Sequence, residues 1–260
     1  MAATRARTPC PPAGPRLWLL PAACLALAAL LWGTGWNREL FLWLNGGWGD
    51  AAWWSRVTVL GDALVVLVLL LPFAGRRPDV LWAALAATVL AVLAVHGLKG
   101  ALDLPRPAAV LPAGWVEVIG PLHRRGSFPS GHTASAFTLA GVLVFCLGRP
   151  LAWGLLLPAA LVALSRVMVG AHWPADLLGG AAVGWLAAAG GTWIAARLPA
   201  GRGPGVQRLL ALGLLAAAAG LWFFDSGYPQ ARGLQRAIAL GAPLAALPGL
   251  WRLFARRPDP

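Results

Sequence analysis

The sequence predicts an all-α protein, a polytopic transmembrane helix bundle with six core spans and one or two further C-terminal spans. Of its 260 residues, 59% are hydrophobic and only 12% are charged, and the mean hydropathy is +0.70. A soluble domain needs roughly a quarter of its residues charged. Apolar windows of about 17–20 residues recur instead, each long enough to cross a hydrocarbon layer of about 30 Å. Because backbone groups in lipid must be satisfied internally, we expect these windows to be helices.

The expected spans follow one another with short connections. Residues 1–16 form a predicted cytoplasmic tail, residues 17–200 the membrane core, and residues 201–260 an additional C-terminal segment. Residues 34–54 are rich in Trp and Gly, which is typical of a segment at the level of the lipid headgroups. The sequence leaves open whether residues 236–251 cross the membrane. The expected spans are 17–33, 57–74, 80–98, 133–148, 151–168, 177–196, 208–224 and 236–251.

The first span begins like a secretory or lipoprotein signal, because arginines precede the apolar run L17-W-L-L-P-A-A-C24. Pro21 interrupts that run, however, and the apolar character continues through Trp32. This is too long for the apolar region of a simple signal peptide. We therefore expect a first helix that is retained.

The net charge of +12 does not indicate a nucleic-acid partner, because the arginines lie in the short connections between spans. Cytoplasmic loops of membrane proteins carry an excess of Arg and Lys. We therefore expect a multi-pass protein of a bacterial-type inner membrane, with both termini in the cytoplasm. Residues 99–132 and 165–176 would then face the periplasm or cell exterior. The inside arginines are Arg5, Arg7, Arg16, Arg76, Arg77, Arg149, Arg197, Arg202, Arg208, Arg252, Arg256 and Arg257. The outside arginines are Arg38, Arg56, Arg232 and Arg236, together with those of the segments 99–132 and 165–176.

The three cysteines give no pattern that indicates a disulfide framework or a metal site. Cys24 and Cys146 fall in apolar windows and Cys10 in the tail, without close spacing. We interpret them as small buried apolar residues.

Three polar groups occur at the outer ends of apolar spans, and the first contains the only lysine of the chain. Lys99 ends one span, and Arg106 follows between two prolines. Proline stiffens the chain and keeps the preceding residue out of helical angles, so Arg106 is expected on a rigid, extended loop. Lys99 by itself could simply extend from a helix end to the headgroups.

The second group is S127-F-P-S-G-H-T-A-S135, just before a predicted span. Ser130 and Gly131 would stand at a helix N-terminus, where free N–H groups and the helix dipole attract an anion. Glycine also permits close approach to the backbone. His132 opens the same helix.

The third group is S165-R-V-M-V-G-A-H-W-P-A-D176. Pro174 suits the first turn of a helix, which puts Asp176 near the third position. A carboxylate there can reach back to residues before the helix. Asp176 can thus hold one ring nitrogen of His172 and leave the other directed at a substrate. Arg166 could be an ordinary positive anchor, although it lies on the side that is poor in arginine.

Together these groups supply three cations, one helix N-terminus and two histidines. Phosphoryl transfer suits this set, because Arg forks and N–H groups stabilise the equatorial oxygens of the five-coordinate state. We expect His172 to attack phosphorus and His132 to protonate the leaving oxygen. His132 would then activate the water that cleaves the phosphohistidine.

The motifs K-x6-R-P at 99–107, P-S-G-H at 129–132 and S-R-x5-H-x3-D at 165–176 resemble the signatures of the type 2 phosphatidic acid phosphatase superfamily. The resemblance implies a helical membrane core, His172 as nucleophile and His132 as acid and base. We expect no cofactor and no metal. It implies phosphate binding by Lys99, Arg106 and Arg166, with Ser130 and Gly131 contributing. The expected substrate is a phosphorylated lipid: undecaprenyl pyrophosphate, phosphatidylglycerophosphate, phosphatidate or a lipid A phosphate.

Other interpretations remain open. A lipid phosphotransferase would use the same phosphohistidine, and a membrane protein that only binds or transports lipid could keep the anion site. A metal site could draw on His123, His132, His172 and Asp176, but three nearby cations would repel the ion. His96 is expected to be packed or at the headgroups. The oligomeric state cannot be predicted.

Overall fold

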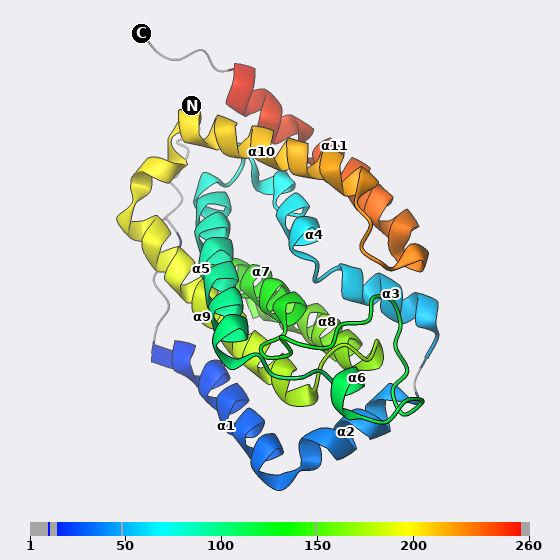
Figure 1. The fold of residues 1–260 in the computed structure, drawn as a ribbon. Helices are drawn as coiled ribbons and strands as arrows, with labels where there is room; N and C mark the ends of the chain where they lie inside the picture. Colours follow the sequence, from blue (N-terminus) through cyan, green and yellow to red (C-terminus); the bar gives the residue numbers. More distant parts are fainter. Residues whose placement is uncertain (1–9, 11–14, 48, 149, 256–260) are drawn as a thin grey trace.

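The computed structural model describes residues 10, 15–47, 49–148 and 150–255, and their regular structure is helical throughout (Figure 1). Five helices in this part of the chain are long and apolar enough to cross a membrane, or up to seven if each of two bent pairs is one span. The expected all-α, multi-pass membrane bundle is confirmed. The helices are α1 (Leu19–Thr34), α2 (Trp36–Asn45), α3 (Ala51–Val59), α4 (Ala63–Val68), α5 (Pro78–Leu102), α6 (Pro107–Val110), α7 (Gly131–Leu147), α8 (Leu156–Met168), α9 (Pro174–Arg197), α10 (Pro204–Phe223) and α11 (Arg232–Ala255).

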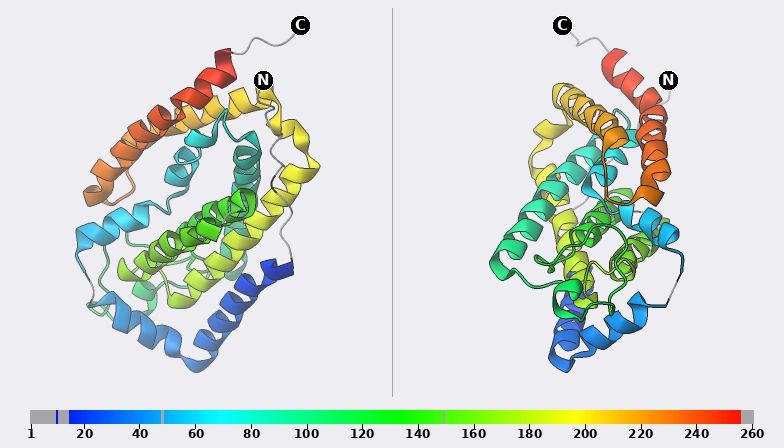
Figure 2. Two further views of the ribbon diagram at one scale, coloured as in Figure 1. Left: turned by 180° about the vertical axis from the view of Figure 1, so that it is seen from behind. Right: turned by 45° about the vertical axis from the view of Figure 1, so that its right-hand side comes forward.

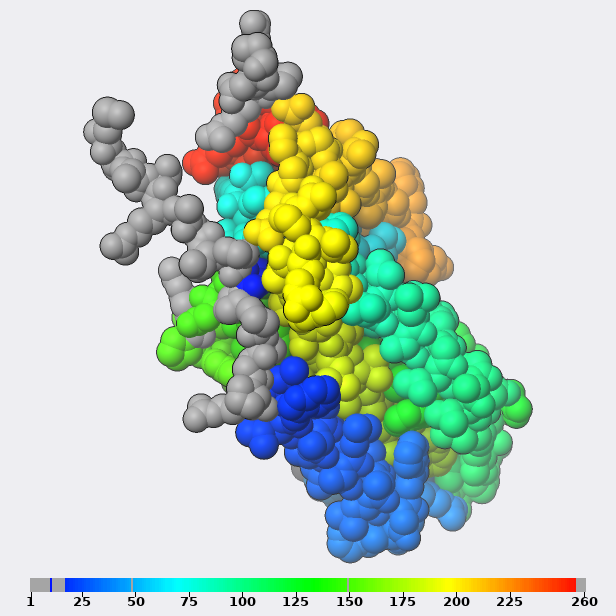
Figure 3. All heavy atoms as spheres, turned by 90° about the vertical axis from the view of Figure 1, so that its left-hand side faces the viewer, coloured from blue at the N-terminus to red at the C-terminus, as the bar shows by residue number. Residues whose placement is uncertain are grey.

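Helix α9 is central to the bundle and packs against α1, α5, α7 and α8. On the face shown in Figure 3, it lies between α1 and α5. A Cβ atom added at Gly184 of α9 would lie only 2.3 Å from the Ala134 carbonyl oxygen of α7. Small residues of this kind allow membrane helices to approach closely. The contact brings the N-termini of α7 and α9 together.

The second predicted span is broken, so the prediction of one helix over residues 57–74 is wrong. Helix α3 begins earlier, at Ala51, and α4 follows after a bend of 55°. Asp62 causes the restart, because its Oδ1 accepts a hydrogen bond of 2.8 Å from the Leu64 N–H and caps α4. Helices α1 and α2 are bent by 98° at Gly35, so much of the Trp-rich segment is helical.

The C-terminal helices α10 and α11 form a hairpin that packs beside α4 (Figures 1 and 2). Helix α11 covers the whole of residues 236–251, despite Pro243 and Pro248 within it. Together with the short 3-10 turn Pro229–Ala231 before it, it is long and apolar enough to span. The connection between the two helices lies at the same end of the bundle as the C-terminus of α8 and contacts α3.

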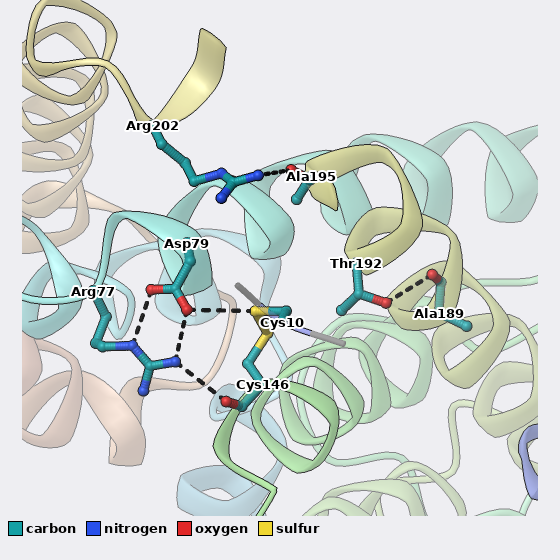
Figure 4. The surroundings of a disulfide bond; sticks show 8 residues. All are labelled: Cys10, Arg77, Asp79, Cys146, Ala189, Thr192, Ala195 and Arg202. Carbon is teal, nitrogen blue, oxygen red and sulfur yellow. Dashed lines mark hydrogen bonds and ion pairs between the residues drawn. A yellow bond between two sulfur atoms is a disulfide. The ribbon is translucent and has the colours of Figure 1, made fainter. Parts of the chain in front are cut away.

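Cys10 and Cys146 form a disulfide, which corrects the interpretation of both as isolated buried residues (Figure 4). Arg77 donates to the Cys146 carbonyl oxygen over 3.2 Å and is paired with Asp79. The two cysteines are 136 residues apart, and local spacing carries no information about such a pair. Cys24 is free and partly buried. Most of the expected cytoplasmic tail, residues 1–9 and 11–14, lies outside the described residues.

Candidate active site

Lys99 and Arg106 converge on one loop, residues 124–126. Lys99 Nζ donates to the Gly126 carbonyl oxygen. Arg106 donates to the same oxygen through Nη2 over 3.4 Å and to the Arg125 carbonyl oxygen through Nε over 3.0 Å. Its backbone is extended, with φ −84° and ψ 164°, as the flanking prolines predict. The two cations are therefore held side by side at the C-terminal end of α5.

Arg106 also reaches the segment that carries His172. Its Nη1 donates to the Ala171 carbonyl oxygen over 3.2 Å. This contact joins the first and third motifs, which lie 65 residues apart.

Ser130 is the N-cap of α7, as predicted. Its buried hydroxyl accepts from the Thr133 N–H at 3.4 Å and from the Thr133 hydroxyl at 2.9 Å. The Ser130 N–H donates to the Asp176 carbonyl oxygen over 3.0 Å. The N-terminus of α7, with Gly131 at its first position, thus lies against the first turn of α9.

Asp176 holds His172 in the predicted way. The Asp176 Oδ2 atom is 3.2 Å from His172 Nδ1 and accepts from the Trp173 N–H at 2.9 Å. Ser127 donates to the same oxygen over 2.5 Å. His172, Asp176 and Ser127 are all buried. With its proton on Nδ1, His172 donates a hydrogen bond to the Asp176 carboxylate, and the lone pair of Nε2 stays available.

Arg166 lies behind His172 and is only 3% exposed. Its carbonyl oxygen accepts from the His172 N–H over 3.1 Å, which ties the end of α8 to the segment that carries His172. Its Nη1 donates to the Thr58 hydroxyl and, over 3.1 Å, to the Tyr228 hydroxyl. Its buried Nε has no hydrogen-bond partner among the described residues.

The electrostatic setting keeps His172 neutral. Burial lowers the pKa of His172 well below 6.5, and the positive charges of Arg106, Arg166 and Lys99 lower it further. A neutral imidazole is the nucleophilic form.

His132 is the second residue of α7. It lines a cavity of about 210 Å³ between α4, α5 and α7, together with Gly131 and apolar residues such as Val66, Val92 and Val95. No hydrogen bond joins His132 to His172 in the described part of the chain, and neither His172 nor the three cations line this cavity. His96 of α5 also lines this cavity. His123 is exposed on the loop before α7.

In the described ranges no group of three or more His, Cys, Asp or Glu side chains is arranged to hold a metal ion. The four residues considered as metal ligands from sequence therefore do not form one cluster. His172 and Asp176 contact each other instead.

Sequence reasoning missed three residues that hold the site together: Ser127, Thr58 and Tyr228. Ser127 stands within the second motif, so its proximity to Asp176 could have been suggested. Tyr228 is the only tyrosine of the chain and lies in a polar connection between two apolar spans. That composition was a usable signal, but its partner could not be identified from sequence. Thr58 gave no signal.

Comparisons with known proteins identify related sequences. Undecaprenyl-diphosphatase BcrC of Bacillus subtilis (strain 168) is 32% identical over 127 residues, which are 48% of this chain and 63% of the relative. Bacitracin transport permease protein BcrC of Bacillus licheniformis is 39% identical over 72 residues, 28% of this chain and 35% of the relative. The chain thus spans less than two thirds of the length of both relatives.

A solved structure extends the likeness to more than half of the chain. The crystal structure of Aquifex aeolicus LpxE shares 31% sequence identity with a TM-score of 0.55, over 60% of this chain and 93% of that one. The family model of the PAP2 superfamily matches residues 80–199, which contain all three motifs. With its motifs, fold and relatives in agreement, the chain belongs to the PAP2 superfamily.

Proposed function

We propose that the protein is a membrane lipid phosphate or pyrophosphate phosphatase that works through a phosphohistidine at the outer face of the membrane. One observation carries the proposal: a buried His172, whose pKa burial and the charges of three cations lower, is oriented by Asp176. Lys99, Arg106 and Arg166 provide the positive charge that a phosphoryl group requires. The Nε atom of Arg166, buried and without a partner in the described chain, is a donor that a phosphoryl oxygen would satisfy.

The two histidines divide the chemistry. His172 Nε2 attacks phosphorus, and a P–N bond forms as the P–O bond to the leaving group breaks. His132 donates a proton to the departing oxygen, which for a pyrophosphate belongs to the lipid monophosphate. His132 then takes a proton from water as that water attacks phosphorus, and the P–N bond breaks to release inorganic phosphate.

The N-terminus of α7 supports binding of the phosphoryl group. A Cβ atom added at Gly131 would meet only Val95, at an ordinary distance of 3.7 Å. Packing within the protein therefore does not demand a glycine at this position. Close approach of an anion to the backbone N–H groups gives a reason for it.

The cavity beside His132 supports a lipid substrate. Most of its lining is apolar, and it runs along α4, α5 and α7 from Gly131 into the spanning part of α5. A hydrocarbon tail placed there would carry its phosphate head to the residues that bind and transfer it. The activity in the name of the Bacillus subtilis relative, an undecaprenyl-diphosphatase, makes a polyprenyl pyrophosphate the first substrate to test.

The deciding experiment measures inorganic phosphate released by purified protein from a polyprenyl pyrophosphate and phosphatidate. We expect the wild type to release phosphate and His172→Ala to lose at least about a thousandfold of the rate, since the nucleophile is gone. The variant should keep the thermal unfolding midpoint of the wild type, and this is the control for folding. Equal phosphate release by both proteins would refute the assignment of His172.

The same experiment separates the other interpretations. A phosphotransferase would yield a new phosphorylated lipid in place of free phosphate. The name of the Bacillus licheniformis relative is that of a transport permease. A transport protein that kept only the anion site would bind the lipid, and neither the wild type nor His172→Ala would release phosphate.

A further inference from the structure

We propose that the C-terminal hairpin is a working part of the active site, with Tyr228 as a positioning residue for Arg166. The inference rests on the proposed function. It concerns a segment beyond the family match, which ends at residue 199. The hairpin would therefore add to the site a side chain that the core helices do not supply.

The contact itself is the first argument. The Tyr228 hydroxyl accepts a hydrogen bond of 3.1 Å from Arg166 Nη1, and both side chains are buried. Hydrogen bonds to a charged group are stronger than those between neutral groups. Such a bond can determine which edge of the guanidinium faces the substrate.

The geometry of the guanidinium gives the second argument. Arg166 Nη1 carries two hydrogens and has two acceptors, Thr58 on α3 and Tyr228 on the hairpin. These acceptors occupy one end of the planar fork. The Nε atom, on the opposite edge, is the buried donor without a partner in the described chain. When these two acceptors hold Nη1, the edge of the Arg166 guanidinium that carries Nε is left to bind an oxyanion.

The docking of the connection is the third argument. A Cβ atom added at Gly120 would lie 2.4 Å from Cε1 of the Tyr228 ring, so the ring packs directly on the loop before α7. Pro121 makes a similarly close approach to Gly227. Ser55 of α3 donates to Gln230 over 3.5 Å, next to Thr58 on the same helix. The connection is thus fitted between α3 and the 116–123 loop, and the position of Tyr228 is determined on both sides.

Tyr228→Phe tests the inference, because it removes the hydroxyl and keeps the ring that packs on Gly120. We expect kcat/KM to fall about tenfold, mainly through kcat, as expected for loss of a hydrogen bond to a charged group. Orthovanadate, which can adopt the five-coordinate geometry, should bind about tenfold more weakly. The thermal unfolding midpoint should stay close to that of the wild type.

Thr58→Val and the double variant complete the design. Because Thr58 and Tyr228 hold the same nitrogen, their effects on vanadate affinity should be non-additive. Asp225→Asn is the matched control in the same connection. It keeps the Oδ1 acceptor for the Gly227 N–H and removes only an exposed contact of 3.8 Å with Arg232, so activity should be unchanged.

Vanadate affinity and kcat/KM of Tyr228→Phe within twofold of the wild type would overturn the inference. A loss of activity that follows a loss of thermal stability, with unchanged vanadate affinity per folded protein, would also overturn it. Since vanadate binding needs no turnover, weaker binding in Tyr228→Phe supports the inference even if no lipid in the panel is hydrolysed. In that case only the proposed function fails.

Discussion

A single oxygen of Asp176 orients His172, the proposed nucleophile. Oδ2 accepts from the Ser127 hydroxyl and the Trp173 N–H and lies 3.2 Å from His172 Nδ1. The first two donors fix the carboxylate, and the carboxylate fixes the tautomer and the ring orientation of His172. Orientation of this kind acts through another group and need not touch the substrate.

Removal of the Ser127 hydroxyl should therefore slow catalysis. For Ser127→Ala we expect kcat to fall roughly 10- to 100-fold, the range for loss of a buried hydrogen bond to a charged group. Phosphate release under saturating lipid measures it. Thr192→Ala is the matched control, because it removes a buried hydroxyl at the other end of α9 that bonds only locally, to Ala189 over 2.8 Å. Equal kcat values for the two variants would contradict this role of Ser127.

The lowered pKa of His172 predicts the pH dependence. A histidine with a pKa below 6.5 stays neutral to lower pH, so the nucleophile is lost only as the pH falls through this lowered value. In kcat/KM, which reports the free enzyme, the acidic limb should lie below pH 6.5. In kcat the acidic limb should lie at a higher pH, because the negative charge of the bound phosphoryl group favours the protonated form of His172.

The measurement is steady-state kinetics across the acidic range, with the ionisation of the substrate determined separately by phosphorus NMR. A fall in kcat/KM toward acid that begins above pH 6.5, and that ionisation of the substrate does not explain, would argue against a lowered pKa of His172 in the free enzyme.

At the scale of elements, two helix N-termini and two helix C-termini meet at the site. The starts of α7 and α9 are joined by the Ser130–Asp176 backbone hydrogen bond, and the ends of α5 and α8 supply Lys99 and Arg166. The sequence predicted the starts of α7 and α9 well, because Pro174, Asp176 and Ser130 are capping residues with local effects. Apolar windows likewise predicted α5, α8, α9 and α10 to within a few residues.

The sequence predictions failed where the structure depends on a helix cap within an apolar window or on contacts between distant residues. Apolar content favoured one helix over residues 57–74, but the cap at Asp62 divides it. The partners of Arg166 could not be predicted either, because Thr58 and Tyr228 lie 108 and 62 residues away from it. Hydropathy and motif spacing indicate where each helix ends. They do not indicate which side chain of a distant segment contacts that helix.

At the scale of the whole molecule, the arginine distribution predicts the orientation in the membrane. Among described residues, Arg76, Arg77, Arg197 and Arg202 lie at the end opposite the site. Excess positive charge favours the cytoplasmic side, so the site should face outward. This orientation remains a prediction, since membrane placement depends on the cell as well as on the fold.

Cysteine labelling in intact cells tests the orientation. Ala113 and Ala200 are exposed, the first on the loop near the site and the second at the opposite end. A membrane-impermeant maleimide should label Ala113→Cys in intact cells and Ala200→Cys only after permeabilisation. The wild type, with its own three cysteines, gives the background. The reverse labelling pattern would mean that the site faces the cytoplasm.

The Cys10–Cys146 pair lies at the α7 end remote from the site, beside Arg77 and Asp79 (Figure 4). Cytosolic glutathione and thioredoxin keep thiols reduced, whereas oxidising compartments preserve disulfides. The chain thus contains a native indicator of sidedness. Two titratable thiols at these positions in freshly lysed cells would mark this end as cytosolic, and a persistent cross-link would mark it as external, without any engineered probe.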